Sequence, residues 1–140
     1  MNSLRLSFLP GLIAGVISIF TSWFWIAFVF HRQQRATPQT WRSESARHHL
    51  LSSVIQVAAG IAIATMYVMV ARGNAGTLGD GLYGAAWFAV IGWAAFSATV
   101  LFTISIYVNI HPLVTVGLLL NWLTTALLAS CLTAWWLGFA

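Results

Sequence analysis

The chain has 140 residues, of which 60% are hydrophobic and only 6% are charged, and its formal net charge is +4. An ordinary soluble domain carries about 25% charged residues, so water cannot be the solvent for most of this surface. The length leaves room for one transmembrane domain, residues 1–140, and excludes a separate soluble catalytic domain.

Four long uncharged stretches follow one another along the chain and predict helices at roughly 6–30, 46–71, 82–108 and 113–138. About 20 helical residues cross the ~30 Å hydrocarbon core of a bilayer. Backbone groups in lipid must bond within their own segment, which favours helices. The stretches are continuously apolar and do not alternate, so a β-barrel is excluded. We predict an all-α fold, an integral membrane bundle of four antiparallel transmembrane helices.

The connection between the first two predicted helices is the basic part of the chain. All six basic residues are arginine, and this connection holds four of them: Arg32, Arg35, Arg42 and Arg47. Short basic loops stay in the cytoplasm, which predicts a multi-pass protein of the bacterial inner membrane with both termini outside. Each arginine near the surface attracts anionic lipid head groups by about 1 kcal/mol. Lipids are therefore the expected partners, and a short loop offers no folded basic patch for nucleic acid.

The same connection contains a sequence signal for the start of the second helix. Ser43 is a favourable N-cap residue, and Glu44 would lie at the positive end of the helix dipole. We therefore expect the helix to begin there, near the membrane surface.

Small residues recur at helical spacing on three of the four predicted helices. They are Gly11, Gly15 and Ser18 on the first helix, Gly60 and Ala64 on the second, and Ala85, Ala89 and Gly92 on the third. Faces of small residues let transmembrane helices approach closely. The pattern predicts a tight bundle, and it favours a homo-oligomer or a place in a larger membrane complex.

Polar side chains within the helices gather in the half of the membrane nearest the arginine-rich loop. At 1.5 Å per residue, six of them lie about 8–14 Å from the helix ends at that face: Thr21, Ser22, Gln56, Thr99, Thr103 and Asn121. The other half of the first, second and fourth helices reads as nearly apolar. A buried amide needs hydrogen-bonding partners. The layer is either inter-helix glue, worth about 0.6–2 kcal/mol per contact, or a polar vestibule open to the cytoplasm.

Aromatic residues give a further set of expectations. Tyr67 is expected in an interfacial aromatic belt, where Trp and Tyr are enriched. Trp93 and Trp122 fall near mid-membrane, where an indole N–H needs a partner. Two interpretations remain open for these tryptophans: they fill space between helices, or they stack on a ligand.

Four histidines fall on the predicted cytoplasmic face: His31, His48, His49 and His111. Imidazoles there could bind a transition metal or carry protons, or simply lie near lipid phosphates. No two of them have the spacing of four residues that pairs ligands on one helix face, so no metal site is predicted. The predicted helices also contain no carboxylate and no recognisable catalytic motif. No catalytic residue is therefore assigned, and the sequence requires no cofactor.

The layout resembles the small bacterial four-helix membrane proteins of the domain-of-unknown-function family numbered 1761. The features that carry the resemblance are Trp23 and Trp25, Trp41 in a polar first loop, Trp93 to Phe96, and the stretch from Tyr107 to Pro112. The similarity covers nearly the whole chain and implies the fold. It implies no catalytic residues, because that family carries no established activity. The chain departs from the expected pattern at Asn121-Trp122, where a glycine–aromatic pair is expected.

Three functions remain open from the sequence. The favoured one is a non-catalytic membrane protein that self-associates or serves as an accessory subunit of a membrane complex. The second is a pore or carrier for a small neutral or weakly polar solute that uses the polar layer. The third is a cofactor-dependent redox subunit that uses the histidines.

Overall fold

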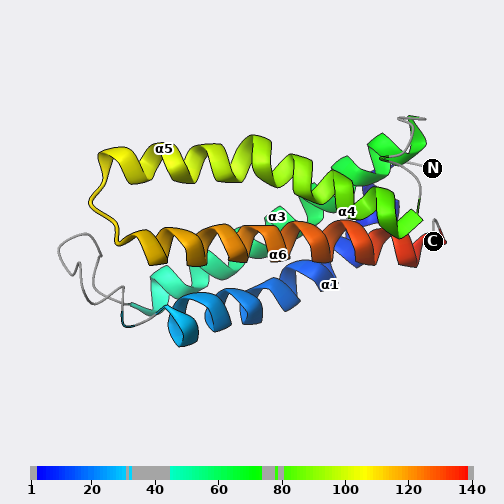
Figure 1. Ribbon diagram of the computed structural model, residues 1–140. Coiled ribbons are helices and arrows are strands. Elements are labelled where there is room, and N and C mark those ends of the chain that lie inside the picture. Colours follow the sequence, from blue (N-terminus) through cyan, green and yellow to red (C-terminus); the bar gives the residue numbers. More distant parts are fainter. Residues whose placement is uncertain (1–2, 31, 33–44, 74–77, 79–80, 139–140) are drawn as a thin grey trace.

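Four long helical segments make up the computed structural model, which describes residues 3–30, 32, 45–73, 78 and 81–138 (Figure 1). In chain order the elements are α1 (Ser3–Trp23), the π-helix η1 (Phe24–Val29), α3 (Ala46–Arg72), α4 (Gly81–Gly92), the π-helix η4 (Trp93–Ala98), α5 (Thr99–Tyr107) and α6 (Pro112–Trp136). The described residues contain no strand. Each of the four segments is long and apolar enough to cross a membrane. The expected all-α four-helix fold is confirmed, and the chain is a multi-pass membrane protein.

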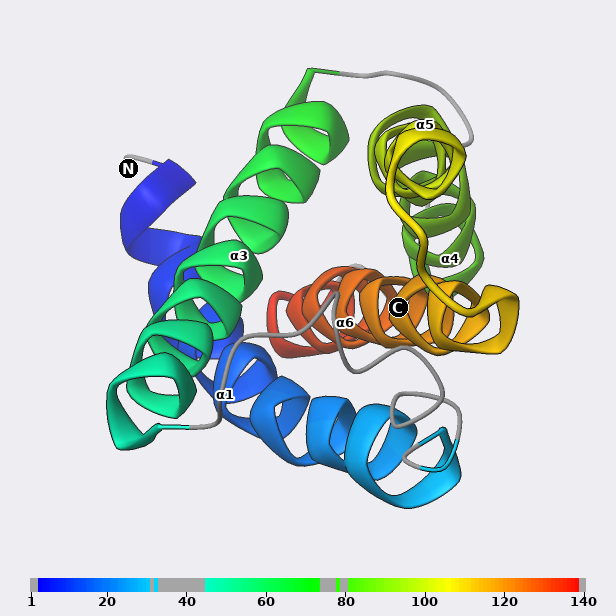
Figure 2. The ribbon, with the colours of Figure 1, turned by 90° about the vertical axis from the view of Figure 1, so that its left-hand side faces the viewer.

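Helix α6 lies at the centre of the bundle. Half of its most apolar stretch is buried, against 11% for the segment formed by α4, η4 and α5. It packs against α1, α3 and α4, and Figure 2 shows it between α1 and α4. The two chain ends lie at one end of the bundle, which we call the terminal end. The opposite end, where α3 begins and Val108–His111 joins α5 to α6, is the loop end.

The two helices that begin at the loop end both carry a side-chain cap. The hydroxyl of Ser45 accepts a hydrogen bond from the backbone N–H of His48 at 3.4 Å, and α3 starts at the next residue. Ser43 and Glu44 lie outside the described residues, and the expected cap at Ser43 is replaced by Ser45. At the start of α6, Nδ1 of His111 accepts from the N–H of Leu113 at 3.2 Å, and Pro112 occupies the first turn.

Helices α1 and α3 make the closest crossing in the molecule. A Cβ atom built on Gly15 would lie 2.6 Å from Cα of Val57, and one built on Gly60 would lie 2.7 Å from Cα of Gly15. A Cβ on Gly11 would lie 2.7 Å from Cα of Ile61. These distances leave no space for a side chain, so the crossing requires glycine. Ser18 and Ala64, from the same two faces, are also buried.

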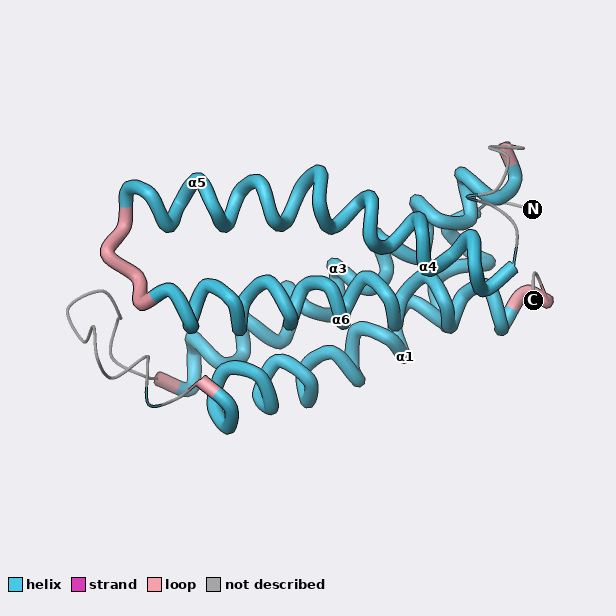
Figure 3. Tube along the Cα trace, in the orientation of Figure 1, coloured by secondary structure: helices cyan, strands magenta, loops and turns pink. Residues whose placement is uncertain are grey.

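The second half of the bundle is much looser. Helix α4 buries Ala85 and Ala89, packs against α6 and has little contact with α3. Helix α5 then stands away from α6 towards the loop end (Figure 3), and none of its residues is buried. Gly92 is the exception in the small face of this segment, because a Cβ built there would meet no atom within 4 Å. The expectation that Gly92 packs against another helix is therefore wrong.

Candidate functional site

The polar layer expected from the sequence is centred on the contact between α3 and α6. Gln56 is 5% exposed and Asn121 is 2% exposed. Thr125, one turn after Asn121, is also buried, and its Oγ1 lies 3.4 Å from Oε1 of Gln56. The same hydroxyl lies 2.9 Å from the backbone carbonyl oxygen of Asn121. Gln56 and Asn121 thus share one layer, and Thr125 connects them.

Hydrogen bonding within this layer is incomplete. A hydroxyl has one proton to donate, and the shorter bond from Thr125 to the carbonyl of Asn121 is the stronger, so Gln56 is held weakly. Oδ1 of Asn121 is fully buried and has no partner among the described residues, and the same is true of Oγ1 of Thr115. An unsatisfied buried group costs about 1–3 kcal/mol. The layer therefore has unused capacity to bind a hydrogen-bond donor.

Two of the six residues expected in the layer lie outside it. Thr99 and Thr103 are exposed, and each hydroxyl donates to its own helix, to the carbonyl of Ala94 at 3.1 Å and of Thr99 at 2.8 Å. Thr21 is half-buried and donates to the carbonyl of Ser18 at 3.1 Å, and Ser22 is half-buried. The expectation is wrong for Thr99 and Thr103, because α5 stands away from the core that holds Gln56 and Asn121.

Polar contacts also occur at the terminal end, where the sequence predicts a nearly apolar half of the bundle. The hydroxyls of Ser7 in α1 and Thr65 in α3 lie 2.7 Å apart. Ser130 and Thr133 of α6 are fully buried and donate to carbonyls one turn earlier, at 2.7 Å and 2.6 Å. Hydroxyl groups bonded in this way can lie in the core at little cost. Serine and threonine positions therefore do not show which half of the bundle is polar.

Two tryptophans link the helices through their indole N–H groups. Nε1 of Trp25 donates to Oγ1 of Thr124 at 3.2 Å, and Nε1 of Trp93 donates to the backbone carbonyl of Leu119 at 2.9 Å. Both acceptors belong to α6. Trp25 lies in η1 and Trp93 opens η4, so each π-helical turn is anchored to the central helix. Trp93 thus fills space between helices and also makes a hydrogen bond to α6.

The histidines and arginines form no cluster in the described part of the chain. His48 and His49 are exposed at the start of α3, and His111 caps α6. Arg32 and Arg47 are exposed. The remaining predicted residues, His31, Arg35 and Arg42, lie outside the described residues. No group of three or more His, Cys, Asp or Glu residues that could hold a metal occurs among the described ones.

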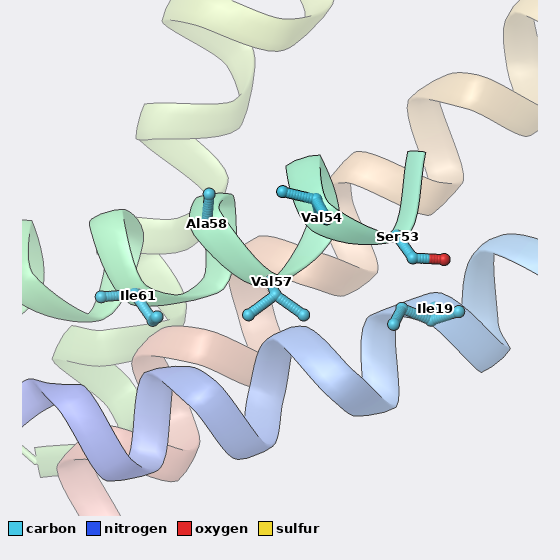
Figure 4. Close-up of a pocket in the computed structure, with 6 residues that line it drawn as sticks. All are labelled: Ile19, Ser53, Val54, Val57, Ala58 and Ile61. Carbon is cyan, nitrogen blue, oxygen red and sulfur yellow. The ribbon is translucent and has the colours of Figure 1, made fainter. Parts of the chain in front are cut away.

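A shallow depression of about 360 Å³ lies along the seam between α1 and α3 (Figure 4). Ile19 lines it from α1, and Ser53, Val54, Val57, Ala58 and Ile61 line it from α3. Its only polar side chain, Ser53, already donates to the carbonyl of His49 at 2.9 Å. The depression therefore offers a ligand no more than the accepting oxygen of one serine hydroxyl.

Comparison with protein-family models, with curated proteins and with solved structures finds no match to this chain. The resemblance to the family numbered 1761 stays a prediction.

Proposed function

We propose that the chain is a non-catalytic subunit of the bacterial inner membrane that associates with a second copy of itself through the exposed side of η4 and α5. The observation that carries the proposal is the absence of any buried residue in α5, from Thr99 to Tyr107. A helix in the middle of the sequence that buries nothing within its own chain is free to pack against another chain.

The type of residue on that exposed side supports a helix as its partner. Ala95, Thr99 and Thr103 recur every four residues, and all three are exposed. Small residues at this spacing let two helix backbones approach closely. The chain already uses the same device inside the bundle, where Gly11 and Gly15 meet Gly60. We call Ala95, Thr99 and Thr103 the open stripe.

A second copy is the partner that the open stripe favours. The hydroxyls of Thr99 and Thr103 donate within their own helix, but each oxygen can still accept a hydrogen bond, and each proton can change partner. A two-fold dimer places the same surface on both sides of the interface. Two identical stripes then bring small residues and hydroxyl groups together at the interface. Apolar lipid chains packed on the same stripe would offer the hydroxyl groups no hydrogen bonds.

Disulfide cross-linking in native membranes tests the association. With Cys131→Ala as background, a single cysteine is introduced by Thr103→Cys on α5, or by Leu51→Cys on α3 as a control. Leu51 is also exposed, and it lies at a similar distance from the loop end. We expect a covalent dimer from Thr103→Cys and none from Leu51→Cys. Equal cross-linking of the two variants, or none in either, would contradict the proposal. A cross-link from Thr103→Cys to a different protein would instead indicate an accessory subunit.

The orientation is part of the same proposal. Four of the six arginines lie in the first connection, so we place this loop in the cytoplasm and both termini outside, with the helices crossing antiparallel. Anionic lipid head groups are the partners expected for Arg32 and Arg47, which are exposed. An impermeant thiol reagent applied to intact cells should label Gly76→Cys and spare Gln34→Cys, both in the Cys131→Ala background. Labelling of Gln34→Cys alone would reverse the orientation.

One observation favours the pore or carrier as the second candidate. Oδ1 of Asn121 is buried without a partner among the described residues, as a solute-binding group would be. However, neither the depression at the α1–α3 seam nor the cavity between α3 and η4 is lined by Gln56 or Asn121. A solute would need a path that this conformation does not provide, which is why we rank this function second.

A further inference from the structure

A long apolar cavity of about 420 Å³ is lined by α3, α4 and η4, with α6 as its floor. Met66 and Val70 line it from α3, Phe88 and Trp93 from α4 and η4, and Trp122 from α6. Beside it, Tyr67 of α3 packs against Phe88 of α4, and α3 and α4 otherwise have little contact. Cavities of 300–1,000 Å³ with mostly apolar walls and a few polar groups are typical of small-molecule sites.

The lining residues show that the cavity is long and narrow. Val70 lies two residues from the terminal end of α3, and Ser97 lies sixteen residues from the start of α4 at the same end. At 1.5 Å per residue these positions differ in depth by roughly 20 Å. A volume of about 420 Å³ over that length leaves a cross-section of roughly 20 Å², enough for one unbranched hydrocarbon chain.

Gly92 is responsible for part of this space. It lines the cavity, and a Cβ built on it would meet nothing within 4 Å. Glycine in a helix interior costs about 1 kcal/mol relative to alanine. Gly15 and Gly60 offset that cost by close helix packing, whereas Gly92 has no such contact. What glycine provides at this position is room within the cavity.

The inner end of the cavity carries two hydrogen-bond donors. Ser97 and Trp122 both line it, and neither the serine hydroxyl nor the indole N–H makes a hydrogen bond within the described part of the chain. A serine in an α-helix commonly donates to the carbonyl one turn earlier. Ser97 lies in the π-helical turn η4 and makes no such bond. π-helical turns often mark functional sites because they redirect side chains in this way.

From these observations we propose that the cavity binds a neutral, unbranched lipophile with a carbonyl oxygen at its leading end, such as a long-chain ketone, aldehyde or ester. The hydrocarbon chain lies between α3 and α4, and the carbonyl accepts from Ser97 and Trp122. A carboxylate is disfavoured, because no described lining residue carries a positive charge and an unpaired charge at this depth is costly. A phospholipid acyl chain ends in a methyl group and would leave both donors unpaired. Ala95 of the open stripe also lines the cavity, so a second copy packed on the stripe would lie beside one wall of the site.

The experiment uses 2-tridecanone labelled with ¹³C at the carbonyl, added to the full chain in nanodiscs. Free ketone dissolves in the lipid and gives one carbonyl resonance. We expect a second, downfield resonance from ketone whose carbonyl accepts hydrogen bonds in the cavity. Gly92→Leu should abolish it by filling the cavity, and Ala94→Leu, on an exposed position of η4 outside the cavity, should preserve it.

Two further variants separate recognition of the carbonyl from simple filling of space. Ser97→Ala and Trp122→Phe keep the cavity open, and each should weaken the downfield shift. Thermal unfolding of every variant shows whether it is folded. If Gly92→Leu does not fold, Ser97→Ala still tests the site. The proposal is overturned if the wild-type chain gives no second resonance, or if Gly92→Leu retains it. Displacement of the ketone by an equal concentration of tridecane, which lacks the carbonyl, would also overturn it.

Discussion

The two halves of this bundle differ in how closely their helices approach one another, as a comparison of Gly15 with Gly92 shows. In α1, Gly15 lies so close to α3 that an added Cβ would come within 2.6 Å of Cα of Val57. In α4, an added Cβ on Gly92 would meet nothing within 4 Å. In the first half, made of α1, α3 and α6, glycines hold α1 and α3 in close contact within one chain. The second half leaves a cavity and an open helix side, so it has the surface for partners and ligands.

The largest expected effect is on the packed half. Gly15→Leu forces a side chain into the backbone of α3, and overpacking of a well-packed contact typically costs about 1–3 kcal/mol. Because the neighbours are backbone atoms that cannot move aside, we expect about 3 kcal/mol or more. Unfolding by a denaturing detergent measures the loss. Gly92→Leu is the matched control and should be neutral or stabilising, so equal losses at the two positions would remove the contrast between the halves.

The next effect concerns the open stripe. Replacing both hydroxyl-bearing residues, by Thr99→Ile and Thr103→Ile, adds branched side chains to a surface that we propose is in close contact with a second copy. We expect roughly tenfold weaker dimerisation, which corresponds to about 1.4 kcal/mol, and an unchanged stability of the single chain. Förster transfer between labelled copies in vesicles at several lipid ratios measures the first, and detergent unfolding measures the second. Tighter association of the double variant would argue against the stripe as the interface.

Replacing the two amide side chains of the polar layer should cost different amounts of bundle stability. Gln56→Leu removes the weak contact with Thr125 and should cost about 1 kcal/mol of bundle stability if the layer is glue. Asn121→Leu removes an oxygen that has no partner among the described residues, and it should cost less than Gln56→Leu. The comparison of the two unfolding curves checks this order. A neutral Gln56→Leu combined with a loss of solute transport would favour the carrier instead.

The smallest effect is expected at the terminal end of the packed half. Ser7→Ala removes the 2.7 Å contact with Thr65, and inter-helix hydrogen bonds of this kind average about 0.6 kcal/mol. Thr65 keeps its bond to the carbonyl of Ile61 at 2.7 Å, so no group is left unpaired. Thr65→Val should cost a similar amount. Strong coupling between the two variants in a double-mutant cycle would show that the contact is worth more than this.

The helix positions could be predicted from the sequence because uninterrupted apolar runs are a strong signal in a membrane protein. The apolar run predicted the start of the second helix at residue 46, which matches α3, although the N-cap is Ser45 and not the expected Ser43. The predicted end of the third helix at residue 108 lies one residue beyond α5. Counting depth along the helices also brought Gln56 and Asn121 into one layer correctly. Both results depend only on length and spacing.

What could not be predicted is the direction in which each helix leaves the bundle. The depth count placed Thr99 and Thr103 at the level of Gln56. However, α5 diverges from α6 after η4, and no residue pattern in the sequence predicts that divergence. Tyr67 was expected in an interfacial belt and is instead fully buried, with its ring against Phe88 and its hydroxyl 3.4 Å from the carbonyl oxygen of Gly81. The two π-helical turns differ from α-helix by one hydrogen-bond register, which composition cannot reveal.

The central claim is that α1 and α3 pack closely within one chain while the open stripe meets a second copy. Spin labels on Thr103→Cys, in the Cys131→Ala background and in lipid vesicles, test it most directly. Packed transmembrane helices lie about 8–10 Å apart, so the account predicts strong dipolar broadening between copies that persists on dilution with lipid, and none for labels on Leu51→Cys. Unbroadened spectra from Thr103→Cys at all lipid ratios would contradict it.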